Sequence, residues 1–316
     1  GGYYMLDNHG RNIDYLRVSL TDRCNLRCVY CMPEKGIEKK HHGEILRFEE
    51  ILKIVRACTL LGVSKVRYTG GEPLILKDID KLIYETSKFE SIKDIAITTN
   101  GVLLGDMAED LKKAGLKRAN ISLDTLRSDR FKQITRLGSL DNVLSSINRC
   151  LSLGFAPLKI NTVVMAGVND DEIKDFINLT RELPVDVRFI ELMPIGEGAK
   201  LYEQQKFSLE KVINTFPELQ PLAQAPESTT KLFKVEGAKG RVGFINPLSC
   251  KFCANCNKIR LTASGSIKPC LHSKEEISLK KYLENDTVLI SALKNIILNK
   301  PSEHHLEVES KSRSIK

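Results

Sequence analysis

The sequence predicts an α/β fold: a partial (βα)6 barrel of the TIM type, followed by a C-terminal extension. Six short, apolar and β-branched segments alternate with helical patterns over the first two thirds of the chain. This alternation is typical of buried parallel strands that are connected by helices. Cysteine, glycine and acidic motifs directly follow several of these strands, at the end of a barrel where chemistry takes place.

The predicted strands are residues 15–20, 65–69, 94–99, 118–124, 158–165 and 186–192. The predicted helices between them are residues 48–61, 78–89, 103–114, 141–153 and 170–183. Gly62, Gly115 and Gly154 each follow a helix, where a left-handed cap favours glycine. Asp141 and Asp170 are expected to be N-caps, because their carboxylates can accept hydrogen bonds from free backbone amides.

The pattern changes after about residue 195, so we divide the chain into an N-terminal segment (1–14), a barrel (15–195) and a C-terminal region (196–316). Residues 220–230 are polar and contain two prolines, which predicts a linker or surface loop. In the C-terminal region we expect short strands at 241–245, 259–262 and 266–269, and a last helix at 287–299.

The composition, with 316 residues, 42% hydrophobic and 28% charged, allows a large core. No run of about 18 apolar residues and no signal peptide is found, so we expect a cytoplasmic protein without a membrane partner. Nine cysteines then favour metal ligands over disulfides, although Cys58 and Cys150 are expected to be buried in helices. The net charge of +8 is spread along the chain, which favours an anionic small substrate over nucleic acid.

Cys24, Cys28 and Cys31 form a C-x3-C-x2-C motif directly after the first predicted strand. Three thiolates can ligate three irons of a [4Fe-4S] cluster and leave the fourth iron open for another ligand. A structural zinc site would need a fourth ligand, and no nearby histidine or cysteine supplies one. Tyr30, between the last two cysteines, is expected to pack near the cluster or its ligand.

Gly70-Gly71-Glu72-Pro73 follows the second predicted strand. Two residues without side chains let the backbone approach a ligand closely, and the carboxylate of Glu72 can accept a hydrogen bond from an ammonium group. Together with the cysteine motif, this segment resembles the radical S-adenosylmethionine (SAM) superfamily. The resemblance implies that the open iron binds the amino-acid end of SAM. The positions that it implies for SAM binding are Tyr30, Gly70, Gly71, Glu72, Ser122 and Met193.

A second group, Cys253, Cys256 and Cys270, has the spacing C-x2-C-x13-C and encloses the basic segment 257–262. Two such triads resemble the GTP 3′,8-cyclase family, whose members catalyse the first step of molybdenum cofactor biosynthesis. The resemblance extends over nearly the whole chain, in residues 10–11, 15–24, 67–73, 98–101, 120–124, 159–161, 189–191 and 241–245.

That resemblance implies two [4Fe-4S] clusters, SAM, and a lyase that converts GTP into (8S)-3′,8-cyclo-7,8-dihydroguanosine 5′-triphosphate. A 5′-deoxyadenosyl radical would abstract H3′ of GTP, whose base would bind the open iron of the second cluster. Arg17 is the candidate catalytic residue. The implied GTP-binding positions are Arg17, Lys65, Arg67, Thr98, Lys159, Lys258, Ile259 and Arg260. The sequence identifies no electron donor, and it is compatible with a homodimer.

The chain also departs from the family. Cys250 adds a fourth cysteine to the second group and would close that cluster if it were a ligand; we interpret it as a non-ligand, because the other three have the family spacing. Leu76 and Lys258 stand where the family commonly has arginines, and Lys258 keeps the charge but loses the bidentate geometry. The chain ends in Ser314-Ile315-Lys316 instead of the usual Gly-Gly.

Two other functions remain open from the sequence. A radical SAM enzyme that modifies peptides would be expected to have more C-terminal cysteines and a peptide-binding extension. A non-enzymatic iron–sulfur electron carrier, or a zinc-ribbon protein that binds nucleic acid, would use four ligands at each site and would not need six β–α units.

Overall fold

One curved sheet of twelve strands carries the fold within residues 5–38, 42–223, 225, 228–248, 253–271, 273 and 275–303, which the computed structural model describes. Its strands are β1 (Tyr15–Ser19), β2 (Lys65–Thr69), β3 (Asp94–Thr99), β4 (Arg118–Ser122), β5 (Leu158–Val164), β6 (Val185–Glu191), β7 (Gln220–Pro221), β8 (Lys231–Lys234), β9 (Arg241–Ile245), β10 (Lys258–Leu261), β11 (Ser266–Lys268) and β12 (Ile277–Ser278).

Strands β1 to β6 are parallel and neighbour one another in chain order, which confirms the predicted partial barrel. The C-terminal region adds a parallel strand on each side, because β9 pairs with β6 and β10 pairs with β1. The outer strands β11, β12, β8 and β7 are antiparallel to their neighbours. Residues before and after position 195 therefore contribute strands to one continuous sheet.

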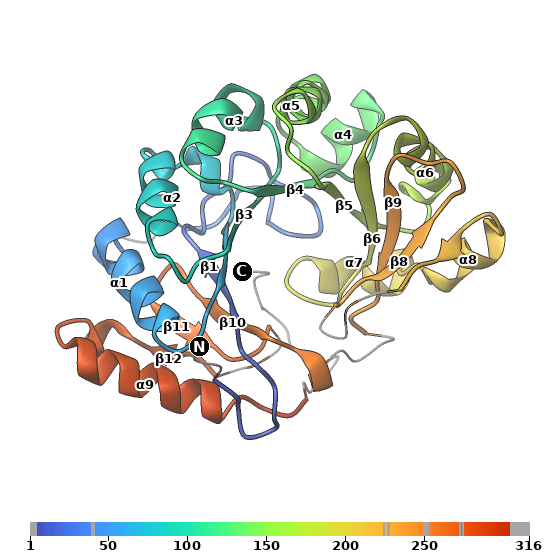
Figure 1. Ribbon diagram of the computed structural model, residues 1–316. Coiled ribbons are helices and arrows are strands. Elements are labelled where there is room, and N and C mark those ends of the chain that lie inside the picture. The colour runs from blue at the N-terminus through green and yellow to red at the C-terminus, as the bar shows by residue number, and fades with distance from the viewer. Residues whose placement is uncertain are drawn as a thin grey trace.

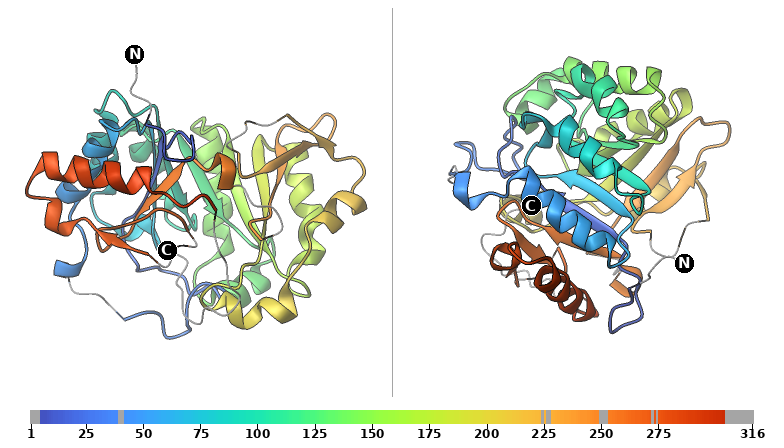
Figure 2. Two further views of the ribbon diagram at one scale, coloured as in Figure 1. Left: turned by 90° about the horizontal axis from the view of Figure 1, so that it is seen from below. Right: turned by 60° about the vertical axis from the view of Figure 1, so that its left-hand side comes forward.

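The helices are α1 (Phe48–Thr59), α2 (Ile79–Ser87), α3 (Leu104–Lys113), α4 (Ser128–Thr135), α5 (Leu140–Ser152), α6 (Ile173–Glu182), α7 (Gly198–Gln205), α8 (Glu210–Thr215) and α9 (Asp286–Leu298). Figure 1 shows α1, α2, α3, α5 and α6 around the outer face of the curved sheet. Helix α9 lies beside α1, so the last helix also covers the outside of the barrel (Figure 2).

The two faces of the sheet differ in polarity because side chains alternate along a strand. In β2, Val66 and Tyr68 are fully buried on the outer face, whereas Lys65, Arg67 and Thr69 are only half-buried on the concave face. Burying each large apolar side chain stabilises the fold by about 1.5–3 kcal/mol. The outer face therefore holds the core, and the concave face is left for polar residues.

Several sequence predictions need correction. Helix α4 was not predicted, because only Phe131 and Ile134 mark its buried face within a charged segment. Asp141 is not an N-cap, since α5 already begins at Leu140. Asp170 is not one either, because it begins a 3-10 turn that precedes α6.

Other details are confirmed. The three glycines after α1, α3 and α5 have positive φ angles of 92°, 109° and 73°, respectively. Cys58 and Cys150 are buried. Part of the predicted loop at 220–230 is instead the short strand β7. Cys250 and the C-terminal residues 304–316 lie outside the described residues. No helix in the described part of the chain is both long and apolar enough to span a bilayer.

Candidate active site

The loop with Cys24, Cys28 and Cys31 follows β1 and lies at the carboxyl ends of the parallel strands. The thiols interact electrostatically, since Cys24 raises the pKa of both Cys28 and Cys31, and Cys31 raises that of Cys28. Burial, the carboxylate of Asp124, Cys31 and Cys24 hold the pKa of Cys28 well above its usual value. Burial, Cys24 and Asp124 raise the pKa of Cys31 to about 11. Iron binding must therefore displace protons from this triad.

The Gly-Gly turn after β2 packs against the chain that leads into this loop. A Cβ atom on Gly70 would lie 2.5 Å from the carbonyl oxygen of Thr21, and one on Gly71 would lie 2.1 Å from that of Arg23. The amides of Gly71 and Glu72 donate to these two carbonyls, at 2.6 and 2.8 Å. Glycine is therefore required here because two backbones are in contact.

Glu72 and Asn100 connect the ends of β2 and β3 to the same loop. The buried carboxylate of Glu72 accepts hydrogen bonds from Thr99 Oγ1 (2.7 Å), the Asn100 amide (2.7 Å) and the Leu74 amide (3.0 Å). The side chain of Asn100 donates to Asn25 Oδ1 at 2.7 Å and lies 3.8 Å from Cys24 Sγ. Asn100 was not predicted as a site residue, although it follows the third predicted strand.

Tyr30 is fixed by its hydroxyl group, which donates to Asp124 Oδ2 at 2.7 Å. Asp124 also accepts from the Val163 amide at 2.8 Å, and burial raises its pKa to about 6. A Cβ atom on Gly198 would lie 2.7 Å from the carbonyl oxygen of Met193 and 3.3 Å from that of Tyr30. Tyr30 and Met193 are thus brought together beside α7. Ser122, at the end of β4, lies at the same carboxyl edge of the sheet.

The second cysteine group lies at the opposite end of the barrel. Cys253 and Cys256 precede β10, which runs parallel to β1, and Cys270 follows β11, which runs back toward the start of β10. At about 3.3 Å per residue, the five residues of β1 put about 16 Å between the two ends of the barrel. The two triads therefore lie at opposite ends of the strands.

The second cysteine group, at the amino ends of the strands, is held by two buried cations. Arg11 donates to the carbonyl oxygen of Cys253 at 2.9 Å and to those of residues 300, 301 and 302 at 3.0, 2.7 and 3.0 Å. Lys300 donates to the carbonyl oxygen of Pro269, beside Cys270, at 2.6 Å. Burial opposes ionisation of Cys256, but the charge of Lys300, a hydrogen bond from the backbone of Lys258 and the charges of Lys258 and Arg260 together lower its pKa.

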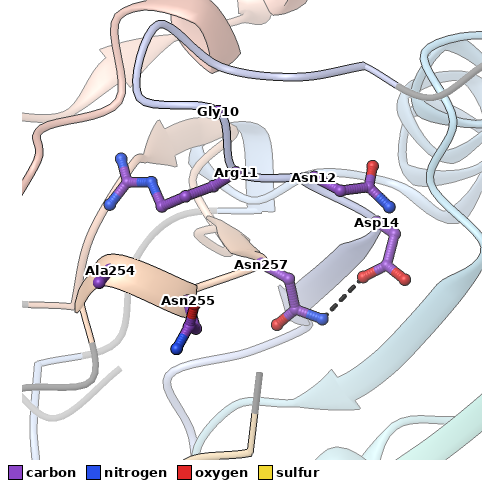
Figure 3. A pocket seen from close by; sticks show the side chains of 7 residues that line it. All are labelled: Gly10, Arg11, Asn12, Asp14, Ala254, Asn255 and Asn257. Atoms are coloured by element: carbon purple, nitrogen blue, oxygen red, sulfur yellow. Dashed lines mark hydrogen bonds between the residues drawn. The ribbon is translucent and has the colours of Figure 1, made fainter. Parts of the chain in front are cut away.

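A pocket of about 320 Å³ opens beside this group (Figure 3). Its lining comes from the N-terminal segment and from the turn that contains the first two cysteines: Gly10, Arg11, Asn12, Asp14, Ala254, Asn255 and Asn257. Asn257 donates to Asp14 at 2.7 Å across its wall. Residues far apart in the sequence thus meet at the amino end of the barrel.

Between the two triads, the concave face carries a row of cations. In the register of the sheet Arg17 is flanked by Arg260 on β10 and by Arg67 on β2. Burial and the charges of these two arginines hold the pKa of Arg17 well below its usual value. Lys258 and Arg67 lie over the ring of Tyr15, 5.7 and 5.3 Å from its centroid. Ile259 is fully buried, so only its backbone belongs to this face.

Lys159 and Arg188 extend the row across β5 and β6. Burial, Arg188, Arg118 and Arg67 lower the pKa of Lys159 to about 7. Burial and Arg67 lower that of Arg188 to about 10. Arg188 was missed in the sequence, where its signal was a lone arginine between the buried Val187 and Phe189 of one strand.

Cations at the amino-terminal edge are paired with carboxylates. Lys65 lies 2.9 Å from Asp14, Arg241 lies 2.6 Å from Asp186, and Arg118 forms an ion pair with Asp94. The pairing of Lys65 leaves it less available to a ligand than the sequence predicted. No carboxylate within the described ranges forms an ion pair with Arg17, Arg67, Lys159, Arg188, Lys258 or Arg260.

Several buried polar atoms of the concave face also lack a hydrogen-bond partner in the described structure. They are Thr98 Oγ1, both side-chain polar atoms of Asn120, Asn161 Oδ1, and the Nε atoms of Arg17, Arg67 and Arg188. Each such group costs about 1–3 kcal/mol when it is left unsatisfied. These donors and acceptors, together with the cations, fit a large polar anion. Each set of three cysteines supplies the thiolates that can ligate an iron–sulfur cluster.

Comparison with known proteins agrees with this arrangement. The Radical SAM superfamily model matches residues 18–180, and the Molybdenum Cofactor Synthesis C model matches residues 185–306. SuiB of Streptococcus suis, in its crystal structure with the precursor peptide SuiA, has a TM-score of 0.66 and 18% identity, over 93% of this chain and 67% of that one; this likeness concerns the fold. The chain therefore belongs to the radical SAM superfamily, whose members use a [4Fe-4S] cluster and SAM.

Curated relatives define the family more narrowly. A GTP 3′,8-cyclase of Clostridium botulinum is 60% identical over 312 residues, which cover 99% of this chain and 98% of that protein. A GTP 3′,8-cyclase of Clostridium acetobutylicum is 56% identical over 313 residues, which cover 99% and 98%. Within the superfamily, the chain belongs to the GTP 3′,8-cyclase family.

Proposed function

We propose that this protein is a lyase that converts GTP into (8S)-3′,8-cyclo-7,8-dihydroguanosine 5′-triphosphate in the cytoplasm, for molybdenum cofactor biosynthesis. The observation that carries the proposal is the row of cations without carboxylate partners between the two triads. A nucleoside triphosphate supplies the negative charges and acceptors that these groups lack. The reaction also requires an electron donor, and a homodimer is compatible with the proposal.

Two clusters are proposed, one for each triad. Cys24, Cys28 and Cys31 would hold the first cluster, whose open iron would bind SAM. Cys253 and Cys256, with Cys270, would hold the second, whose open iron would bind the guanine base. When bound, the first cluster and SAM supply the 5′-deoxyadenosyl radical that removes H3′ of GTP.

The protein residues act mainly by positioning the two ligands and by excluding water. Tyr30, Gly70, Gly71, Ser122 and Met193 would form the SAM site at the carboxyl ends of the strands. Glu72 would belong to the same site, and its oxygens also accept three hydrogen bonds within the protein that hold the Gly-Gly turn in place.

The cations on the concave face would bind the triphosphate. The proposed set is Arg17, Arg67, Lys159, Arg188, Lys258 and Arg260, joined by Thr98 and the backbone at Ile259, while Lys65 would need to exchange Asp14 for the nucleotide. Arg17 lies in the middle of β1, between the two triads, and is the proposed catalytic contact to the substrate.

Anaerobic reconstitution tests the proposal. Two clusters predict about eight irons per chain, release of 5′-deoxyadenosine that depends on GTP, and a cyclised nucleotide detectable by mass spectrometry. About four irons with one bound zinc, or cleavage of SAM that is indifferent to GTP, would contradict it. An enzyme that modifies peptides would produce 5′-deoxyadenosine with a peptide and none with GTP.

A further inference from the structure

The loop with the first cysteine triad is fastened along its length to the end of α4. The amides of Arg27 and Val29 donate to the carbonyl oxygens of Thr135 and Ile134, both at 2.9 Å. Just beyond the helix, a Cβ atom on Gly138 would lie 2.7 Å from Leu26 Cδ2. The cysteine loop, which follows β1, is therefore packed against the end of a helix that follows β4.

Arg136, which ends α4, makes two further contacts with the loop. Its Nη1 donates to the carbonyl oxygen of Arg27 at 2.8 Å and to that of Met32 at 3.1 Å. These two carbonyls lie immediately before Cys28 and immediately after Cys31. One guanidinium group thus holds both ends of the segment that carries the second and third thiols.

The backbone of Arg136 suggests that this side chain has a specific role. Its φ angle is +59°, in the left-handed region where a helix normally ends with glycine. Any residue with a Cβ atom is strained in that conformation. The chain has arginine here in spite of the strain, and the two contacts with the cysteine loop are what the arginine adds.

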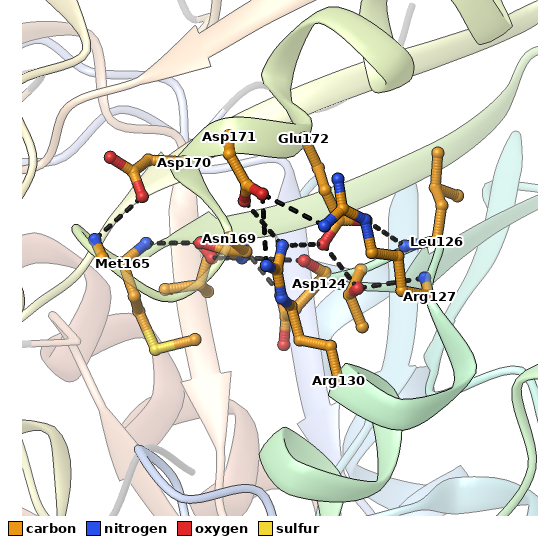
Figure 4. Close-up of polar contacts among 12 residues, drawn as sticks. Asp124, Leu126, Arg127, Arg130, Met165, Asn169, Asp170, Asp171 and Glu172 are labelled. Atoms are coloured by element: carbon orange, nitrogen blue, oxygen red, sulfur yellow. Dashed lines mark hydrogen bonds and ion pairs between the residues drawn. The ribbon is translucent and has the colours of Figure 1, made fainter.

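Helix α4 is in turn anchored to the barrel wall (Figure 4). The fully buried carboxylate of Glu172 accepts from Thr125 Oγ1 at 2.6 Å and from the Leu126 amide at 2.7 Å, which fixes the turn before the helix. Arg130 of α4 forms ion pairs with Glu172 and, at 2.6 Å, with Asp171. Contacts therefore run without interruption from the 3-10 turn before α6, through α4, to the cysteine loop.

We propose that Arg136 is a positioning residue for the first cluster. By holding the carbonyls on both sides of residues 28–31, it would keep two of the three thiols at the spacing that a bound cluster requires. The inference rests on the first cluster of the proposed function. It concerns cluster geometry and does not require Arg136 to stabilise the fold.

Arg136→Gly in the full chain separates these two roles, because glycine relieves the strained backbone while it removes the guanidinium group. Arg136→Lys retains the charge with a less suitable donor geometry. Lys132→Gln is the matched control, since Lys132 is an exposed basic residue one turn earlier on the same helix. The measurements are thermal unfolding of the apo chain, iron content, electron paramagnetic resonance of the reduced protein with and without SAM, and release of 5′-deoxyadenosine.

For Arg136→Gly we expect a melting temperature equal to or above that of the parent, an unchanged second-cluster signal and an altered first-cluster signal that no longer responds to SAM. We expect 5′-deoxyadenosine release to fall about 10–100-fold, as is typical when a residue that supports metal ligands is lost. Arg136→Lys should be intermediate, and Lys132→Gln should match the parent.

A first-cluster signal and a SAM response equal to those of the parent would overturn the inference. So would a lower melting temperature together with equal loss of both clusters, which would make Arg136 a residue of general stability. The proposed function is judged separately, by GTP consumption in the parent. If the parent cleaves SAM but does not cyclise GTP, that function fails, while the comparison of first-cluster spectra still decides the role of Arg136.

Discussion

At the carboxyl ends of the strands, Cys28 and Cys31 lie beside the carboxylate of Asp124, whereas at the amino ends Cys256 lies among Lys300, Lys258 and Arg260. The surroundings shift the thiol pKa values in opposite directions. Burial and Asp124 raise the pKa of Cys28, while the cations lower the pKa of Cys256 in spite of burial.

The difference indicates which ligand each end can accept. SAM is a cation at its sulfonium and ammonium groups, and it suits the end with buried carboxylates. GTP is a polyanion, and it suits the end from which the cation row begins. Charge therefore separates two ligands that must meet within one barrel.

Removing one ligand from each triad should give the largest effects. Cys28→Ser should abolish both SAM cleavage and cyclisation, whereas Cys256→Ser should abolish cyclisation and leave an iron content of about four per chain. Iron analysis and 5′-deoxyadenosine release are the measurements, and Cys58→Ala, in the buried core of α1, is the control. Loss of both clusters in either variant would show that the two triads do not bind iron independently. Cys250→Ala should keep activity; complete loss would make Cys250 a ligand.

Neutralising the cation row should have the next largest effect. Arg260→Met removes a buried charge beside Arg17 and is expected to raise the KM for GTP by about 10–100-fold, since a charge-assisted hydrogen bond contributes about 1.5–3 kcal/mol. SAM binding, measured by calorimetry, should be unchanged. Arg149→Met, on the exposed face of α5, is the matched control. An equal loss of SAM and GTP binding would show that the two ends are not electrostatically separate.

The structure explains which parts of this arrangement the sequence could predict. The strands β2, β3 and β9 were predicted at their observed bounds, because their alternation and flanking glycines are local signals. The cysteine triads and the Gly-Gly turn could also be found, because they are local motifs in the sequence. Helix α4 and Arg188 were not found, since their roles depend on what lies opposite them in space: the cysteine loop for α4, and Lys159 and Arg67 for Arg188.

The same reasoning explains why the protein contacts of Glu72 were not predicted. Glu72 is predicted to be an acceptor for the SAM ammonium group, but a single strand-end motif cannot reveal that Thr99 and the amides of Leu74 and Asn100 also donate to its oxygens. The glycines beside it, which are predicted to approach a ligand, also contact the backbone at Thr21 and Arg23. Contacts between strand ends come from the register of the sheet, which no single segment encodes.

Arg11 contacts the second cysteine group at the amino ends of the strands, as Arg136 contacts the first group at the carboxyl ends. Arg11→Met should loosen Cys253 and the chain at residues 300–302, and we expect the second cluster to bind iron about 10–100-fold more weakly. The first-cluster spectrum with SAM should be unchanged. Lys300→Met should act similarly, through Pro269 and Cys270, whereas the exposed Lys294→Met should not. Loss of the first cluster in Arg11→Met would contradict this independence of the two ends.

The smallest expected effect is the pH dependence that comes from Lys159. Its pKa of about 7 in the folded protein lies below its ordinary value of 10.5, because of burial and the neighbouring Arg188, Arg118 and Arg67. Between these two pH values the unfolded chain binds more protons than the folded chain, so the free energy of unfolding should rise with pH in this window. A bound triphosphate restores the proton on Lys159, so GTP binding should take up about one proton at pH 8 and much less at pH 6. Calorimetry in buffers with different ionisation enthalpies measures this uptake. Lys159→Met should remove it, and an unchanged uptake in that variant would assign the proton to another group.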